Sequence, residues 1–217
     1  MQRKLPPYHY VYFSYSLLKI EKFMRKILLV LLCVTLVGCG RNISLFNAAQ
    51  NGNAETVRKL IALGADVNYQ KKDGWTPLMT AAAEGHADAV KVLLENGAKP
   101  NAKSKSGRTA LHFATQYGQE PVVKLLLDYG ADPTAAIYPS FVKEREPKTP
   151  IETALHTFFT TQPKTDKEKK AAYNILKMFI YKTGQVYIQY EGYTPLMLAN
   201  RYHDKTFSEY LTIQGAK

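Results

Sequence analysis

Residues 73–101 read DGWTPLMTAAAEGHADAVKVLLENGAKPN, and the fold can be predicted outward from this stretch. Thr76 and Pro77 predict the start of a helix, because a threonine hydroxyl can cap the first turn and proline is tolerated at the first helical position. The alanines that follow are small enough to let this helix lie close to a neighbour. Gly85 is predicted to end it.

A second helix is predicted directly after this glycine. Val90, Leu93 and Leu94 follow the i, i+3, i+4 spacing that places apolar side chains on one face of a helix. Gly97 can take the left-handed conformation that commonly follows a helix end. The chain up to Gly107 then reads as a turn that leads to the next unit.

The same arrangement recurs with a period of 33 residues. A fixed period of this length predicts a stack of structural repeats, each burying its apolar face against the next. Six positions hold one residue type in all three copies: Leu45, Leu78 and Leu111; Ala48, Ala81 and Ala114; Gly52, Gly85 and Gly118; Val57, Val90 and Val123; Leu60, Leu93 and Leu126; Gly64, Gly97 and Gly130.

At these positions the chain resembles the ankyrin repeat family. Thr76-Pro77-Leu78 and Thr109-Ala110-Leu111-His112 match the T-P-L-H motif of that family, and Gly85-His86 and Gly97-Ala98 match its later positions. The resemblance covers roughly residues 42–138. It implies antiparallel helix pairs that are joined by projecting hairpins and stacked into a solenoid.

The pattern restarts twice more, at Thr149-Pro150 and at Thr194-Pro195-Leu196. We predict two insertions, at 135–148 and at 160–170, the second being a charged loop between the helices of the fourth unit. The predicted fold class is therefore all-α, an ankyrin-repeat solenoid of about five helix-turn-helix units with short hairpin loops, of which the last two are degenerate. The predicted ankyrin-repeat domain is 39–217, with units at about 42–72, 73–105, 106–138, 148–190 and 191–217.

The segment ahead of the repeats resembles a bacterial lipoprotein signal peptide. Residues 24–38 carry Arg25 and Lys26 before a short apolar run, and Leu36-Val37-Gly38-Cys39 resembles a lipobox. The resemblance implies that Cys39 is lipidated and becomes the mature N-terminus. The alternative for this apolar run is a buried core segment.

Two further expectations follow from this resemblance. Met24 is predicted to be the true start, which makes residues 1–23 a non-native upstream extension; the alternative is an extended n-region. We also expect the protein to be lipid-anchored in the bacterial cell envelope, facing the periplasm. Gly40 after the cysteine favours the outer membrane over the inner membrane, because aspartate there would resemble an inner-membrane retention signal.

Charge and cysteine content narrow the function. The segment before Cys39 holds six of the 29 basic and one of the 18 acidic residues, which leaves 23 basic against 17 acidic residues and a net charge of +6. This modest excess favours an acidic protein partner and does not indicate nucleic acid. With Cys33 removed and Cys39 acylated, no disulfide or thiolate metal site is expected. We expect a monomer.

The sequence shows no catalytic or metal-binding motif on which to base an assignment. His86 and His112 occupy family motif positions, and the resemblance implies that they brace the hairpin and helix through hydrogen bonds. His156 and His203 lack the spacing of a metal pair and read as ordinary helix residues. We therefore predict no catalytic residues, no metal, no cofactor and no enzyme activity.

The resemblance implies that a partner binds the concave face formed by the hairpins and the first helices. Trp, Tyr and Arg are the residue types enriched in binding hot spots. The alternative is that some of these side chains pack against neighbouring units. The predicted partner-binding residues are Trp75, Arg108 and Tyr193 before the motif threonine, Glu84, Tyr117 and Tyr202 before the motif glycine or at the matching place, and Tyr69 and Tyr138 beside them.

The predicted function is a non-catalytic protein–protein interaction module, carried by a membrane-anchored ankyrin-repeat lipoprotein of the bacterial envelope. Two alternatives stay open within the envelope. One is an immunity protein that neutralises a toxin acting in the periplasm. The other is a support factor for a periplasmic enzyme or for the envelope-stress response. An enzyme with an unrecognised site is a further alternative.

Overall fold

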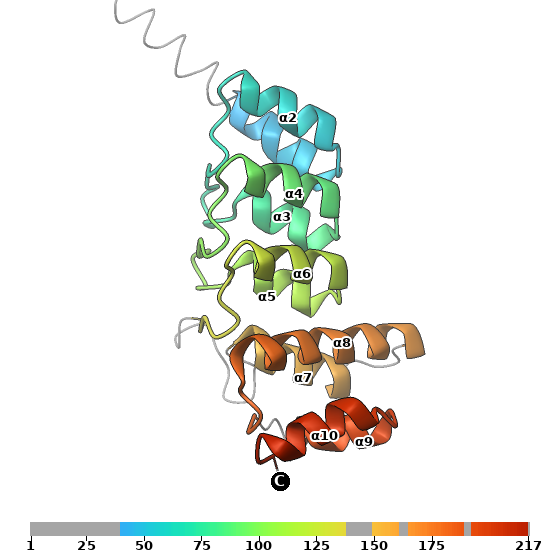
Figure 1. Ribbon diagram of the computed structural model, residues 1–217. Helices are drawn as coiled ribbons and strands as arrows, with labels where there is room; N and C mark the ends of the chain where they lie inside the picture. The colour runs from blue at the N-terminus through green and yellow to red at the C-terminus, as the bar shows by residue number, and fades with distance from the viewer. Residues whose placement is uncertain (1–39, 138–148, 161–164, 189–191, 217) are drawn as a thin grey trace, which may run out of the picture.

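The protein forms an elongated column of stacked helix pairs (Figure 1). The computed structural model describes residues 40–137, 149–160, 165–188 and 192–216, with side chains described up to 156 in the second of these ranges. The predicted signal peptide (24–38), Cys39 and Tyr138 lie outside the described residues. The helices are residues 40–50, α2 (Ala54–Ala62), α3 (Pro77–Glu84), α4 (Ala87–Glu95), α5 (Ala110–Gln116), α6 (Glu120–Asp128), α7 (Pro150–Thr160), α8 (Asp166–Thr183), α9 (Pro195–Arg201) and α10 (Lys205–Ile213).

The predicted helix ends in the second unit are confirmed. The Thr76 hydroxyl accepts a hydrogen bond from the Met79 backbone N–H at 3.2 Å, so it caps α3, and Pro77 is the first helical residue. Gly85 ends α3 in the left-handed region with a φ of +81°. Gly97 follows α4 in the same region with a φ of +85°. Local chemistry therefore sets the helix length in this unit.

The apolar stripes of the second helices form the core between neighbouring units. Leu93 and Leu126 have no exposed surface, and neither does Val90. Leu60 holds the same place in the first unit but is only partly buried. It is less covered because the first unit has a described neighbour on one side only.

Asparagine side chains connect the hairpins of successive units. Asn68 donates a hydrogen bond from Nδ2 to the Gly97 carbonyl at 3.0 Å, and its Oδ1 accepts one from the Lys99 N–H at 2.8 Å. Asn101 makes the equivalent pair of bonds one unit later, to residues 130 and 132. Each asparagine therefore joins its own hairpin to two backbone groups of the next unit, which helps to fix the spacing of the stack.

The prediction of a charged loop at 160–170 is wrong for most of that segment. Helix α7 continues to Thr160, and α8 begins at Asp166 and runs for 18 residues, against 9 residues in α4. Thr165 and Glu168 form a capping box, in which each side chain binds the backbone N–H of the other residue, at 3.3 and 2.9 Å. The insertion therefore lengthens the helices of the fourth unit. Of the other insertion, only residues 135–137 are described, and they are not helical.

Both outer ends of the stack carry polar side chains where inner units carry apolar ones. Lys59 is exposed in the first unit, at the place that the buried Val92 holds in the second. In the last unit Asn200 and Ser208 stand at the places of Ala82 and Val90, and the Ser208 hydroxyl lies 2.9 Å from Asn200 Oδ1. The last unit therefore has the polar outer face that a terminal repeat needs.

Candidate partner-binding surface

Trp75 and Arg108 lie on the same aromatic ring, that of Phe113 in α5. The ring centroids of Trp75 and Phe113 are 4.3 Å apart with an interplanar angle of 40°, and the Arg108 guanidinium lies 5.9 Å from the Phe113 centroid. Trp75 and Arg108, which are 33 residues apart in consecutive units, therefore both lie near one ring of the third unit. Phe113 was not among the predicted site residues, because its place in the second unit is held by Thr80 and no repeat pattern marks it.

The two hairpins hold these side chains in equivalent positions. The Lys71 N–H donates to the Trp75 carbonyl at 3.0 Å, and 33 residues later the Ser104 N–H donates to the Arg108 carbonyl at 2.9 Å. Each hairpin thus closes on the residue directly before the helix cap. The backbone hydrogen bonds of each hairpin therefore place Trp75 and Arg108 at equivalent points of the chain, directly before the helix caps.

Arg108 and Tyr117 lie at opposite ends of α5: the half-buried Arg108 directly precedes the N-cap, and the exposed Tyr117 is the C-cap residue, in the turn that corresponds to Glu84. Arg108 donates a hydrogen bond from Nη1 to Gln116 Oε1 at 2.7 Å, which directs its charge along α5. Tyr117 follows Gln116 at the end of that helix, and 58% of its surface is exposed. Trp75 is half-buried and packs on the core. The alternative that such side chains pack against neighbouring units is therefore correct for Trp75, whereas Tyr117 is available to a partner.

Positive charge gathers on the hairpin beside this cluster. Residues 99–108 contain Lys99, Lys103, Lys105 and Arg108 and no acidic residue. Lys99 and Lys105 are exposed, and so is Lys72 of the preceding hairpin. The turns at the other end of the same helix pairs are acidic. They carry Glu84, Asp88 and Glu120. Units two and three therefore present opposite charges along their two edges.

The other predicted site residues are spread more widely. Glu84 is exposed at the acidic edge, and Tyr69 is half-buried in the first hairpin. Tyr193 is 42% exposed ahead of α9, in the last unit. Tyr138 lies outside the described residues. Whether these side chains contact a partner stays a prediction.

Tyr202 belongs to an internal contact between units four and five. Its ring stacks on that of Tyr173 with centroids 4.6 Å apart and an interplanar angle of 26°. Burial raises the pKa of the Tyr202 hydroxyl above its ordinary value. This environment makes Tyr202 a poor candidate for direct binding, and it marks the joint between the last two units as aromatic.

A carboxylate completes that joint. Asp204 Oδ2 accepts hydrogen bonds from the Tyr173 hydroxyl at 2.9 Å and from Lys177 Nζ at 2.6 Å, while its Oδ1 caps α10 through the Phe207 N–H at 3.1 Å. The hydrogen bond from Lys177 holds the pKa of the Asp204 carboxyl below its ordinary value, although burial opposes this shift. Burial raises the pKa of Tyr173, and the neighbouring carboxylate adds to the effect.

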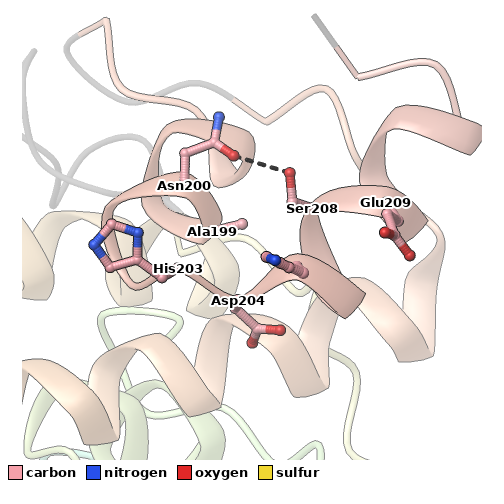
Figure 2. A pocket seen from close by; sticks show the side chains of 7 residues that line it. Ala199, Asn200, His203, Asp204, Ser208 and Glu209 are labelled. Atoms are coloured by element: carbon pink, nitrogen blue, oxygen red, sulfur yellow. Dashed lines mark hydrogen bonds between the residues drawn. The ribbon is translucent and has the colours of Figure 1, made fainter.

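A shallow cavity of about 300 Å³ lies on the outer side of the last unit (Figure 2). All of its lining residues except Ala199 are polar or charged types, and the hydrogen bond between Asn200 and Ser208 runs along it. His203 lies at one side of it, and its backbone takes a φ of +52° where other units have glycine. The cavity is distant in the stack from the Trp75 cluster, which lies in units two and three (Figure 1).

Comparison with known proteins identifies the regular part of the chain. Residues 45–137 match the family model described as ankyrin repeats, in 3 copies. The fold is an ankyrin-repeat solenoid. Ankyrin repeats are protein–protein interaction modules and are typically not catalytic. No curated protein matches the sequence.

The ankyrin histidines have the bracing role that the resemblance implied. His86 donates from Nε2 to the Gln50 carbonyl of the preceding unit at 2.9 Å. His112 Nδ1 accepts a hydrogen bond from the Thr109 N–H at 3.1 Å, which completes a capping box. Within the described ranges, no group of three His, Cys, Asp or Glu side chains is placed to hold a metal ion. In the same ranges, no helix has the length and apolar character needed to cross a membrane.

Proposed function

We propose that this protein is a lipid-anchored ankyrin-repeat module of the bacterial cell envelope that binds an acidic protein partner. The observation that carries the proposal is the cluster of Trp75, Phe113 and Arg108 beside the three lysines of residues 99–107. An aromatic surface with a guanidinium at its edge can stack on a partner's rings and hydrogen-bond its carboxylates.

Tyr117 and Arg108 form the contact point of this surface, and Trp75 and Phe113 support them. A side chain that is 58% exposed and aromatic, as Tyr117 is, loses much water-accessible area when a partner covers it. Lys105 and Lys72 border the cluster on the hairpin side and attract an acidic segment. Such long-range attraction raises the association rate and weakens with added salt.

Membrane attachment rests on the sequence ahead of the repeats. Arg25 and Lys26, a short apolar run and Gly38-Cys39 occur in the order of a lipoprotein signal. We expect Cys39→Ser to leave an unprocessed precursor without acyl groups. Palmitate labelling that persists in this variant would remove the envelope part of the proposal and leave the binding surface untouched.

Site-specific photocrosslinking tests the binding surface. A photoreactive phenylalanine analogue replaces Tyr117 in full-length protein expressed in its own host. The matched control places the same analogue at Tyr129, another helix-end tyrosine of the third unit, which is 41% exposed. We expect one dominant crosslinked protein from position 117 and none from position 129. Equal crosslinking at both positions, or none at 117, contradicts the proposal.

The captured protein also separates the possible roles in the envelope. A secreted toxin as the crosslinked species identifies an immunity protein. A periplasmic enzyme or a stress-signalling component identifies a support factor. In both cases the proposal predicts an acidic segment at the site of crosslinking.

A further inference from the structure

The first unit has an exposed apolar corner where its two helices meet. Ile43 lies one turn into the helix 40–50 and is 45% exposed, and Leu63 ends α2 and is 63% exposed. The Arg41 guanidinium donates a hydrogen bond to the Leu63 carbonyl, so the start of one helix is fastened to the end of the other. The Asp66 N–H strengthens this junction through Asn42 Oδ1 at 2.8 Å.

Cations surround this corner. Arg58 and Lys59 are exposed on α2, and Arg41 lies at the junction itself. Glu55 faces Lys59 at 3.4 Å, and the exposed Asp66 at the junction is a second acidic neighbour of the group. Because both members of the Glu55–Lys59 pair are largely exposed, it offsets charge without holding the lysine in place. The corner therefore combines two aliphatic side chains with a net positive charge.

The sequence leaves no linker between this corner and the proposed lipid. Cys39 directly precedes Gly40, and Gly40 is already helical. A tether of several flexible residues would let the module move away from the bilayer by a few ångströms per residue. A lipid on Cys39 instead brings the corner of Ile43 and Leu63 to the level of the phospholipid headgroups.

We infer that this corner, formed by Arg41, Ile43, Arg58, Lys59 and Leu63, is a contact surface for an anionic lipid bilayer and sets the orientation of the stack. The inference rests on the proposed lipidation of Cys39. Aliphatic side chains flanked by lysine and arginine suit the boundary between headgroups and acyl chains. The solenoid then stands on its first unit, with the fifth unit about 40 Å further from the bilayer at a layer spacing of about 10 Å.

This orientation constrains the partner. The Trp75 cluster lies in units two and three, which places it about 10–20 Å above the headgroups on the same layer spacing. A partner must then present its acidic segment close to the membrane surface. A protein that stays further from the bilayer would meet only the last units.

Fluorescence quenching by headgroup-labelled lipid tests the orientation in the processed, full-length lipoprotein. The protein is reconstituted in vesicles of phosphatidylethanolamine and phosphatidylglycerol that contain a nitroxide-headgroup lipid. A fluorophore is attached to Ala62→Cys at the corner or to Ile213→Cys in the last unit, since the chain has only Cys33 and Cys39, of which the first is removed with the proposed signal peptide and the second is acylated. We expect strong quenching at position 62 and little at position 213.

A matched pair of variants shows whether the corner itself makes the contact. Leu63 and Tyr129 hold the same repeat position 66 residues apart, and both are exposed. Because the acyl group alone keeps the first unit near the bilayer, Leu63→Glu should weaken the quenching at position 62 without abolishing it, whereas Tyr129→Glu should leave it unchanged. Quenching at position 62 that is the same with and without Leu63→Glu overturns the inference, because the tether alone then explains proximity.

Two other outcomes also decide the matter. Equal quenching at positions 62 and 213 in protein whose mass shows an acyl group overturns the orientation and leaves the proposed function standing. Protein whose mass shows no acyl group on Cys39 overturns the orientation together with the membrane part of the proposed function. Binding of the crosslinked partner stays a separate measurement in either case.

Discussion

Units two and three are joined to their neighbours differently from units four and five. In the second unit the N-cap residue of the second helix, His86, reaches back to a backbone carbonyl of the preceding unit. In the fifth unit the corresponding N-cap residue is Asp204, and it binds the side chains of Tyr173 and Lys177. The regular joint therefore depends on backbone groups, and the irregular joint on three particular side chains.

This difference explains which part of the chain matches the family. Backbone-mediated joints repeat without regard to the residues between them, so the sequence can keep one motif for three units. A joint made of a carboxylate, an ammonium group and stacked rings depends on residues that no repeat pattern specifies. The match to ankyrin repeats accordingly ends at residue 137, before the fourth unit.

The largest expected effect contrasts Leu93 with Leu211, which both have no exposed surface and lie four residues before a left-handed glycine. Leu93→Ala should lower the free energy of unfolding by about 2–5 kcal/mol, the usual range for a buried leucine. Leu211→Ala should instead unfold the last unit in a separate, earlier transition, because terminal repeats have one neighbour only. Urea unfolding followed by circular dichroism distinguishes the two. Identical shifts of one transition would mean that the five units act as a single cooperative block.

The next effect tests the tight contact between regular hairpins. A Cβ at Gly74 would lie 2.7 Å from the Lys105 backbone nitrogen, whereas one at Gly97 would meet nothing within 4 Å. Both glycines have positive φ, so each alanine substitution costs about 1–2 kcal/mol in backbone conformation. Gly74→Ala should lower the free energy of unfolding by more than this backbone cost, whereas Gly97→Ala should lower it by the backbone cost alone. Equal losses in thermal unfolding would show that the hairpins of units one and two are not in close contact.

The joint of the last two units should respond to acid. The pKa of the Asp204 carboxyl is lowered in the folded protein, so the ionised carboxylate stabilises the fold at pH values above the pKa of the unfolded state. This stabilisation is lost as the pH falls from about 4 through the folded-state pKa. Asp204→Asn retains a side chain that can cap α10 but removes the charge. The substitution should lower the free energy of unfolding by about 1–2 kcal/mol near neutral pH and by less in acid. A loss that is the same at pH 3 and pH 7 would contradict a role for this charge.

The smallest effect concerns the turn in the last unit. His203 has a φ of +52° where the second and third units have Gly85 and Gly118. His203→Gly should relieve backbone strain and raise stability by about 1 kcal/mol or less, because glycine also gains freedom in the unfolded chain. Differential scanning calorimetry measures the change, with Asn200→Gly as a control inside α9 that should be destabilising. A lower melting temperature for His203→Gly would show that the imidazole makes a stabilising contact.

The sequence predicted the regular units well, because local chemistry determines them. A threonine followed by proline favours the start of a helix, and Thr76 caps α3 in this way. Glycine adopts the left-handed conformation found at 85 and 97 with the least strain. The prediction of a loop at 160–170 is wrong because it gives the charges of this segment more weight than a local helix signal. Thr165 and Glu168 have the spacing of a capping box, and the lysines around them are good helix formers.

The candidate surface was only partly predictable. The repeat spacing gives Trp75 and Arg108 equivalent positions in consecutive units, and the structure brings both close to Phe113. The spacing does not reveal the role of Phe113, or that Tyr202 packs on Tyr173, because both contacts depend on one residue in one unit. Periodicity predicts positions shared by all units, whereas a binding surface is formed by the residues in which units differ.

The most direct test of the account is the affinity of the crosslinked partner for the double variant Arg108→Ala, Tyr117→Ala. Trp75 is left in place, since its stacking on Phe113 links two units and its loss would also reduce stability. Titration calorimetry should show at least about a tenfold loss of affinity, the scale of truncating interface hot spots, with the melting temperature nearly unchanged. The control Tyr129→Ala should bind as the unaltered protein does. Unchanged affinity in the double variant would contradict the assignment of this surface as the partner-binding site.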